Sequence, residues 1–288
     1  MIDAPGFYYD VPSSVYHADP CPIPSLSSGI LRTIVGQSIE HAASQHSRIG
    51  GVRRDSTPAM GLGSVVHGLL AGDASELEKG PFENYKTGAA QLWKRETELA
   101  GKAPVLERDL VDARPIVQAI RDKAGLGITN DPFSAISKSE VTAVWREGNA
   151  WCRARYDRLA IDPYGYADIW DWKTTRDISD RGIAQSIAKM GYHIQAAFYL
   201  RGLLAIEPLY AGRVSFIFCF VETAPPYHVR RAVLSQTFLR IGHAKVNEGL
   251  SAWQHAQATN DFRAPFRDTL EVEAPAYLED DDEISMSD

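Results

Sequence analysis

Three strand-forming segments follow one another in the middle of this chain, and they limit the folds that it can adopt. They span residues 139–147, 150–162 and 166–174, and the first alternates β-branched and aromatic residues with polar ones. Only the turn-like "EGN" separates the first two segments, which predicts a β-hairpin. Two more strands are expected at 213–222 and 227–234, after a helical stretch. The order of segments predicts one mixed β-sheet.

Apolar residues at helical spacing occupy most of the remaining sequence. Helices are expected at residues 25–48, 59–72, 88–101, 106–124, 179–205 and 235–259, the fifth of them interrupted near Gly191. We therefore predict an α/β fold in which helices flank a mixed central sheet. The predicted organisation is an N-terminal helical layer at 1–130, a core at 131–262 and an acidic tail at 263–288.

The chain has 288 residues and a formal net charge of −7, but the acidic excess is concentrated at one end. From Glu271 to Asp288 there are eight acidic residues and no Lys or Arg, so the remainder has 37 − 8 = 29 acids against 30 bases. A nearly neutral body of this kind is compatible with a basic groove. The tail is expected to be flexible and to keep the protein soluble, with partner binding and nucleic-acid mimicry as alternatives.

Several classes of protein are disfavoured by what the sequence lacks. No apolar run has the length of a membrane span, and the N-terminus does not have the pattern of a secretory signal. The cysteines Cys21, Cys152 and Cys219 are scattered and form no CxxC cluster. We therefore expect a cytoplasmic protein of a bacterial host cell, without membrane contact, disulfide framework or iron–sulfur cluster.

The third predicted strand ends in the charged stretch "DWKTT", residues 171–175. Asp171 and Lys173 lie two positions apart, so they share one face of the strand. Burying these charges is costly unless each has a partner or a metal ion. The pair is either a salt bridge at the rim of the sheet or part of an active site.

Two further carboxylates occur on the preceding strands. Asp157 lies within the second strand and Glu140 stands at the start of the first. If the strands are neighbours, three carboxylates and Lys173 converge at one edge of the sheet. Carboxylate oxygens suit Mg²⁺ or Mn²⁺, and a lysine beside them can orient a water molecule or stabilise phosphoryl charge. The alternatives are an ion pair of Asp157 with Arg155 or Arg158, and a solvated strand end at Glu140.

The helix after the third strand adds two candidate residues. Gln195 and Tyr199 are four positions apart and so lie on one face of that helix. Gln195 is expected to hydrogen-bond the attacking water or a phosphate group, with Tyr199 in support. The alternative is that both residues form the edge of an amphipathic helix.

Four other residues are candidates for contacts with phosphate. The guanidinium groups of Arg153 and Arg155 match phosphate geometry, although both side chains can simply be solvated. Ser27 and Ser28 precede a predicted helix and either bind a phosphate at its N-terminus or only cap it.

The order of these motifs resembles the PD-(D/E)xK nuclease superfamily in its RecB/RecE-like branch, and most closely the phage RecE-type exonucleases. The resemblance covers about residues 25–222. The matching residues are His67 in "GSVVHGLL", Glu140 in "SEVTAVW", Asp157 in "RYDRL", Asp171 and Lys173 in "DWK", and Gln195 and Tyr199 in "YHIQAAFYL". The cysteine cluster of the relatives that carry an iron–sulfur centre is absent here.

The resemblance implies a restriction-endonuclease-like core and a metal site. Its ligands would be His67, Asp157, Asp171 and the backbone carbonyl of Trp172, with Glu140 as a further ligand. From the residues alone, a packed histidine on an apolar helix explains His67 better, and its role as a ligand rests on the resemblance.

The resemblance also implies an activity: a Mg²⁺- or Mn²⁺-dependent exonuclease that degrades one strand of linear double-stranded DNA from the 5′ end. Relatives act in phage-type recombination beside a single-strand annealing protein and often assemble as rings, so a homo-oligomer is expected. The alternatives are an inactive DNA-binding or assembly protein of the same fold, and an endonuclease or single-strand-specific nuclease.

Overall fold

The structure is a computed structural model that describes residues 1–51, 58–72, 77–100, 102–128, 130–264, 269 and 272–273. Residues 58–60 are described by their backbone alone. Most of the predicted acidic tail lies outside the described residues.

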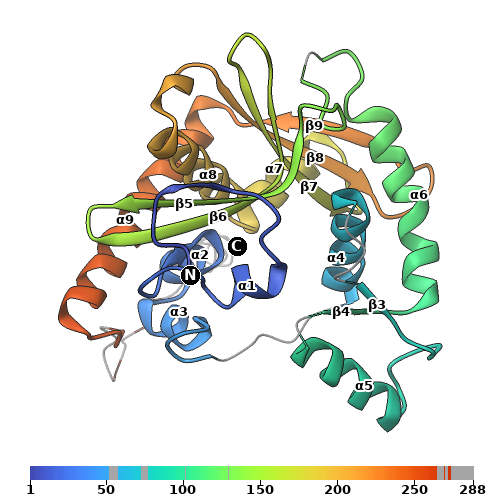
Figure 1. The fold of residues 1–288 in the computed structure, drawn as a ribbon, viewed down its shortest axis with the longest axis horizontal. Coiled ribbons are helices and arrows are strands. Elements are labelled where there is room, and N and C mark those ends of the chain that lie inside the picture. Colours follow the sequence, from blue (N-terminus) through green and yellow to red (C-terminus); the bar gives the residue numbers. More distant parts are fainter. Residues whose placement is uncertain are drawn as a thin grey trace, which may run out of the picture.

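A mixed sheet runs through the centre of the molecule (Figure 1). In the described part of the chain its strands are β1 (Gly6–Tyr8), β2 (Leu26–Ser27), β5 (Lys138–Glu147), β6 (Ala150–Ile161), β7 (Ala167–Thr175), β8 (Val214–Glu222) and β9 (Val229–Val233). They lie in the order β1-β5-β6-β7-β8-β9, and β2 pairs with β6. The β2–β6 and β7–β8 pairs are parallel and the other pairs are antiparallel.

Helices cover both faces of this sheet, so the architecture has three layers (Figure 1). One face packs against α2 (Ser28–Gly36), α3 (Ile39–Gln45), α7 (Asp180–Lys189), α8 (Tyr192–Ile206) and α9 (Gln236–Thr259). The other packs against α4 (Pro58–Ala71) and α6 (Glu107–Lys123). The short α1 (Ser13–His17) and η2 (Pro208–Tyr210) lie in connections. A separate pair, β3 (Leu77–Lys79) and β4 (Ala103–Val105), carries α5 (Gly88–Leu99) away from the sheet.

The sheet forks between β6 and β7. These two strands pair only from Arg158–Trp170 to Ile161–Ala167, whereas β6 pairs with β2 further back, at Cys152 and Arg153. Strand β7 meanwhile continues beside β8 as far as Thr175. Asp157 and Asp171 are the first residues past the last β6–β7 pair, so the base of the fork has a carboxylate on each side.

The predicted fold class is confirmed, and the five long strands agree with the predicted segments to within a residue or two. The predicted break near Gly191 is also present, because this residue separates α7 from α8 with φ 67°. The predicted single helix at 25–48 was wrong: β2, α2 and α3 occupy it, and the Ser38 side chain caps α3. The first 130 residues are likewise more than a helical layer, because β1 and β2 belong to the central sheet.

Within the described residues, no helix combines the length and the apolar character that crossing a membrane requires.

Candidate active site

Asp171 and Lys173 occupy the end of β7 and face α8. The Lys173 ammonium group is ion-paired with Asp171 Oδ1, and Gln195 Nε2 donates a hydrogen bond of 2.5 Å to Asp171 Oδ2. The Lys173 Nζ atom also lies 4.6 Å from the centre of the Tyr192 ring. With its side chain only 2% exposed, Asp171 lies at the bottom of the site. The pair is therefore part of a larger polar cluster and is not a rim salt bridge.

His67, Asp157 and the peptide group of Trp172 form the second part of the cluster. Asp157 Oδ2 accepts a hydrogen bond of 2.7 Å from the Trp172 N–H and lies 3.3 Å from His67 Nδ1. The other imidazole nitrogen, Nε2, lies 2.9 Å from the Trp172 carbonyl oxygen. Helix α4 thus holds His67 across the fork, against the two strands that carry the carboxylates.

Glu140 lies opposite Asp157 in the register of β5 and β6, where Ser139 pairs with Arg158 and Val141 with Tyr156. Its carboxylate forms an ion pair with Arg155, with Oε2 2.5 Å from Nε. The alternative of a fully solvated strand end does not fit, because the Glu140 side chain is 30% exposed and paired.

Burial and charge shift the titration of the whole cluster. Burial raises the pKa of Asp171 and, followed by the charge of Asp157, raises the pKa of Glu140 to about 7. Burial alone would raise the pKa of Asp157 and lower that of His67. The attraction between these two outweighs burial, so the Asp157 pKa is lowered and the His67 pKa is raised to about 9. At neutral pH His67 is therefore an imidazolium that donates to Trp172 and to Asp157.

The remaining predicted residues lie farther from the cluster. Tyr199 packs its ring against Tyr156 and Phe216 in the core. Burial raises the pKa of the Tyr199 hydroxyl, which is hydrogen-bonded with Ser28. Ser27 caps α2 by accepting a hydrogen bond from the Ile30 N–H.

The structure does not bring Arg153 to the site. Its guanidinium is buried, donates to the Ser25 carbonyl and pairs with Asp19. Arg153 therefore attaches the N-terminal segment to β6 and does not face the fork. Arg155 pairs through Nε with Glu140 and lies over the ring of Tyr16, so it borders the site, while its Nη1 is buried without a hydrogen-bond partner.

The donor set fits a hard divalent cation. Three carboxylates, one imidazole and one backbone carbonyl meet at the fork. The carboxylate and carbonyl oxygens are the ligand types that Mg²⁺ and Mn²⁺ use, and the imidazole is a ligand type of transition-metal ions. Among the described residues, no three His, Cys, Asp or Glu side chains form a ready-made ligand cluster. Here the donors bond one another, and the positive charges of His67 and Lys173 balance the carboxylates.

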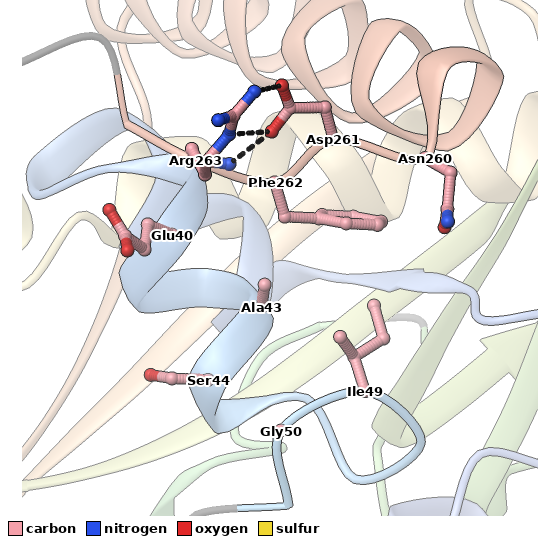
Figure 2. Close-up of a pocket in the computed structure, with 9 residues that line it drawn as sticks. All are labelled: Glu40, Ala43, Ser44, Ile49, Gly50, Asn260, Asp261, Phe262 and Arg263. Carbon is pink, nitrogen blue, oxygen red and sulfur yellow. Dashed lines mark hydrogen bonds and ion pairs between the residues drawn. The ribbon is translucent and has the colours of Figure 1, made fainter.

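Two surface pockets of the described residues lie away from this cluster. One of ≈ 450 Å³ lies between α3 and the segment after α9, where Asp261 and Arg263 pair with each other (Figure 2). The other, of ≈ 620 Å³, lies beside β3 and the start of α6. Neither contains a predicted site residue, so neither bears on the chemistry of the fork.

The sequence reasoning missed two contributors to the cluster. The ring of Tyr192 faces the Lys173 ammonium, and the N–H of Trp172 joins Asp157 to β7. Tyr192 stands three residues before Gln195, so helical periodicity could have placed it on the same face. No sequence signal identifies a single backbone N–H.

Comparison with known proteins gives one family and one informative fold. A solved structure described as a "putative exonuclease", from Eubacterium rectale, superposes with a TM-score of 0.58 at 13% identity, covering 93% of this chain and 94% of the other. A second, SSO0001, has a TM-score of 0.27 at 14% identity, covering 76% and 84%, and carries no argument. No curated protein matches this chain.

At this low identity the first superposition establishes the fold alone, a mixed sheet flanked by helices of the PDDEXK nuclease type. The family model for the "PDDEXK-like domain of unknown function (DUF3799)" matches residues 36–265, well over half of the sequence. The chain therefore belongs to this family of PDDEXK-like domains.

Proposed function

We propose that this protein is a metal-dependent deoxyribonuclease that hydrolyses phosphodiester bonds at the β6–β7 fork. One observation carries the proposal: Asp157, Asp171 and Lys173 meet there with His67 from another layer of the fold. Membership of a PDDEXK-like family supports the same reading.

Each residue then has a role set by its position. Asp157, Asp171, the Trp172 carbonyl and His67 would hold Mg²⁺ or Mn²⁺, with the imidazole of His67 giving up a proton when the metal binds. Glu140 lies close enough in the register to assist. The bound cation would polarise a phosphoryl oxygen and lower the pKa of a water molecule. Lys173, steadied by the Tyr192 ring, offers positive charge to the phosphate. Gln195 fixes the orientation of Asp171.

For the finer activity we propose exonucleolytic degradation of linear double-stranded DNA from the 5′ end, as in RecE-type enzymes. Two points support it: the order of motifs from His67 to Tyr199, and the description of the Eubacterium rectale protein as a putative exonuclease. A role in phage-type recombination, a single-strand annealing partner and a ring-shaped homo-oligomer complete the proposal. They rest on the family resemblance.

The experiment uses linear duplex DNA labelled separately at its 5′ and 3′ ends, with Mg²⁺ or with EDTA. Wild type is compared with Asp171→Asn and Lys173→Met. Lys102→Met is the matched control, because Lys102 also pairs with a carboxylate, that of Glu78, but on the exposed β3–β4 pair. Metal-dependent release of the 5′ label, abolished in both site variants and kept in the control, is the expected result.

Three other results would overturn parts of the proposal. Release of the 3′ label first would reverse the polarity. Cleavage of covalently closed circular duplex would identify an endonuclease. Retarded but intact DNA from wild type in the presence of Mg²⁺ would leave a DNA-binding module.

A further inference from the structure

The C-terminal end of α4 is held by side chains from three other elements. The Leu70 carbonyl accepts a hydrogen bond of 2.9 Å from Arg158 Nη2, and the Leu69 carbonyl accepts one of 3.2 Å from Arg121 Nη2. The Ala71 carbonyl accepts one of 3.1 Å from the Ser139 hydroxyl. The last carbonyls of a helix have no partner within it, so these three donors satisfy a real deficit.

These donors are placed next to the residues of the fork. Ser139 directly precedes Glu140 on β5, and Arg158 directly follows Asp157 on β6. Ser139 and Arg158 are also paired with each other in the register of the two strands. Strands β5 and β6 therefore each contribute both a carboxylate to the fork and a hydrogen bond to the end of the helix that carries His67.

The ring of Phe133 closes the same network on its other side. It stacks on Trp172, with ring centres 5.6 Å apart and an angle of 4° between the planes. The guanidinium groups of Arg158 and Arg121 lie 5.2 and 5.9 Å from its centre. Trp172 in turn supplies the peptide group that bonds His67 and Asp157. The Phe133 ring therefore contacts both Trp172, which bonds His67, and the two arginines that bond the end of α4.

We propose that Arg158, assisted by Arg121 and Ser139, is a positioning residue that sets the place of His67 in the fork. His67 stands one helical turn before the capped carbonyls, so a shift of the helix end moves the imidazole away from Trp172. The two positive charges also interact favourably with the C-terminal end of the helix dipole. The inference rests on the proposed function only in that it gives His67 a role in catalysis.

A matched control exists elsewhere in the fold. Arg231, on β9, donates from Nη1 to the carbonyls of Ala124 and Leu126 at 3.3 and 3.0 Å, just after the end of α6. It therefore braces a helix end in the same manner, but α6 carries no residue of the fork and reaches the network around His67 only through Arg121. If Arg158 acts only by stabilising the fold, replacing Arg158 or Arg231 should have the same effect on the His67 signal and on Mn²⁺ binding.

The experiment compares Arg158→Met with Arg231→Met in the full chain, with histidines labelled with ¹⁵N. The first readout is the imidazole spectrum of the metal-free protein, in which the His67 Nε2–H is bonded to a carbonyl. We expect this signal to move to the position of a solvent-exposed imidazole in Arg158→Met and to stay in place in Arg231→Met. The second readout is the Mn²⁺ concentration that gives half-maximal thermal stabilisation, which we expect to rise about tenfold in Arg158→Met alone.

An unchanged His67 signal in folded Arg158→Met would overturn the inference, as would an equal shift in Arg231→Met. If Arg158→Met does not fold, Ser139→Ala removes one donor with little change in volume and is held to the same spectral criterion. A wild type without nuclease activity would overturn the proposed function, while the metal-free spectra would still decide the role of Arg158.

Discussion

Glu140 adopts a backbone conformation that few residues of its type accept. It has φ 50° inside β5, in the left-handed region that costs a side chain with a Cβ about 1 kcal/mol or more. Its carboxylate is also unfavourably placed, because burial and the facing Asp157 raise its pKa to about 7. Strain of both kinds at one residue is typical of functional sites.

This conformation predicts a difference between two neutral substitutions of Glu140. Asparagine tolerates the left-handed region better than glutamine, while both remove the charge and the ion pair with Arg155. We expect Glu140→Asn to be more stable than Glu140→Gln by about 1 kcal/mol in urea unfolding. Equal stabilities would mean that the backbone at this position relaxes without cost.

Asp19 predicts a dependence of stability on pH. It is buried with Arg153, His46 and Ser25, at 3.1 Å from the Arg153 guanidinium. Burial alone would raise its pKa, but the hydrogen bond with His46 and the charge of Arg153 outweigh burial and hold the pKa below its ordinary value of 3.8.

A lowered carboxyl pKa stabilises the fold fully above the unfolded pKa, and this contribution declines below that value and is lost as the pH falls through the folded pKa. We therefore expect Asp19→Asn to cost about 3 kcal/mol at pH 6 and clearly less at pH 3. The measurement is urea unfolding of both proteins at the two pH values. A cost that is constant with pH would contradict the assignment. Asparagine also accepts the φ of 67° at this position, so the substitution tests the loss of the charge without adding backbone strain.

At the scale of single residues, the sequence could predict the carboxylates and Lys173 because charges at the end of an apolar strand need a partner. It could not separate Arg153 from a surface arginine. The Ser25 carbonyl that Arg153 binds lies 128 positions away, and no local pattern encodes such a pairing.

At the scale of elements, α8 and α9 cross where α9 has a glycine. A Cβ at Gly242 would lie 2.3 Å from the His193 carbonyl oxygen, two residues before Gln195. We expect Gly242→Ala to lower the free energy of unfolding by about 2 kcal/mol and to reduce nuclease activity, because it pushes α8 from its place.

Gly61 on α4 provides the comparison. Among the described residues, none has an atom within 4 Å of a Cβ at this exposed position, so Gly61→Ala should stabilise the protein by about 0.5 kcal/mol through helix propensity. Denaturant unfolding of both variants checks that the free energy of unfolding falls in Gly242→Ala and rises in Gly61→Ala. A neutral Gly242→Ala would show that the helices can separate at no cost.

Long elements were predictable from sequence and short ones were not. Strands β5 to β8 are long enough to show their pattern, whereas β1 and β2 have three and two residues. Such strands exist only because a distant partner offers hydrogen bonds: β2 pairs with Cys152 and Arg153. Their position depends on the whole fold.

At the scale of the whole molecule, elements from the first 130 residues complete the predicted core at 131–262. Strand β2 extends the sheet beside β6, α2 packs against α8 and α9, and α4 supplies His67. We expect a chain restricted to residues 131–262 to lack a cooperative unfolding transition and a native near-ultraviolet circular dichroism spectrum. A sharp transition in that fragment would show that the N-terminal layer is a separable addition.

The fork between β6 and β7 has a consequence for how the sheet exchanges hydrogen with solvent. The Trp172 N–H points across the fork, so by strand alternation the Thr174 N–H points the same way, where β6 has already turned aside. The Trp170 N–H, two residues earlier, still faces a paired strand. Deuterium should therefore enter at Thr174 long before Trp170, and an Asp157→Ala change should extend the labile region to Trp172. The change from slow to fast hydrogen exchange would then fall within β7, between Trp170 and Thr174, beside Asp157 and Asp171.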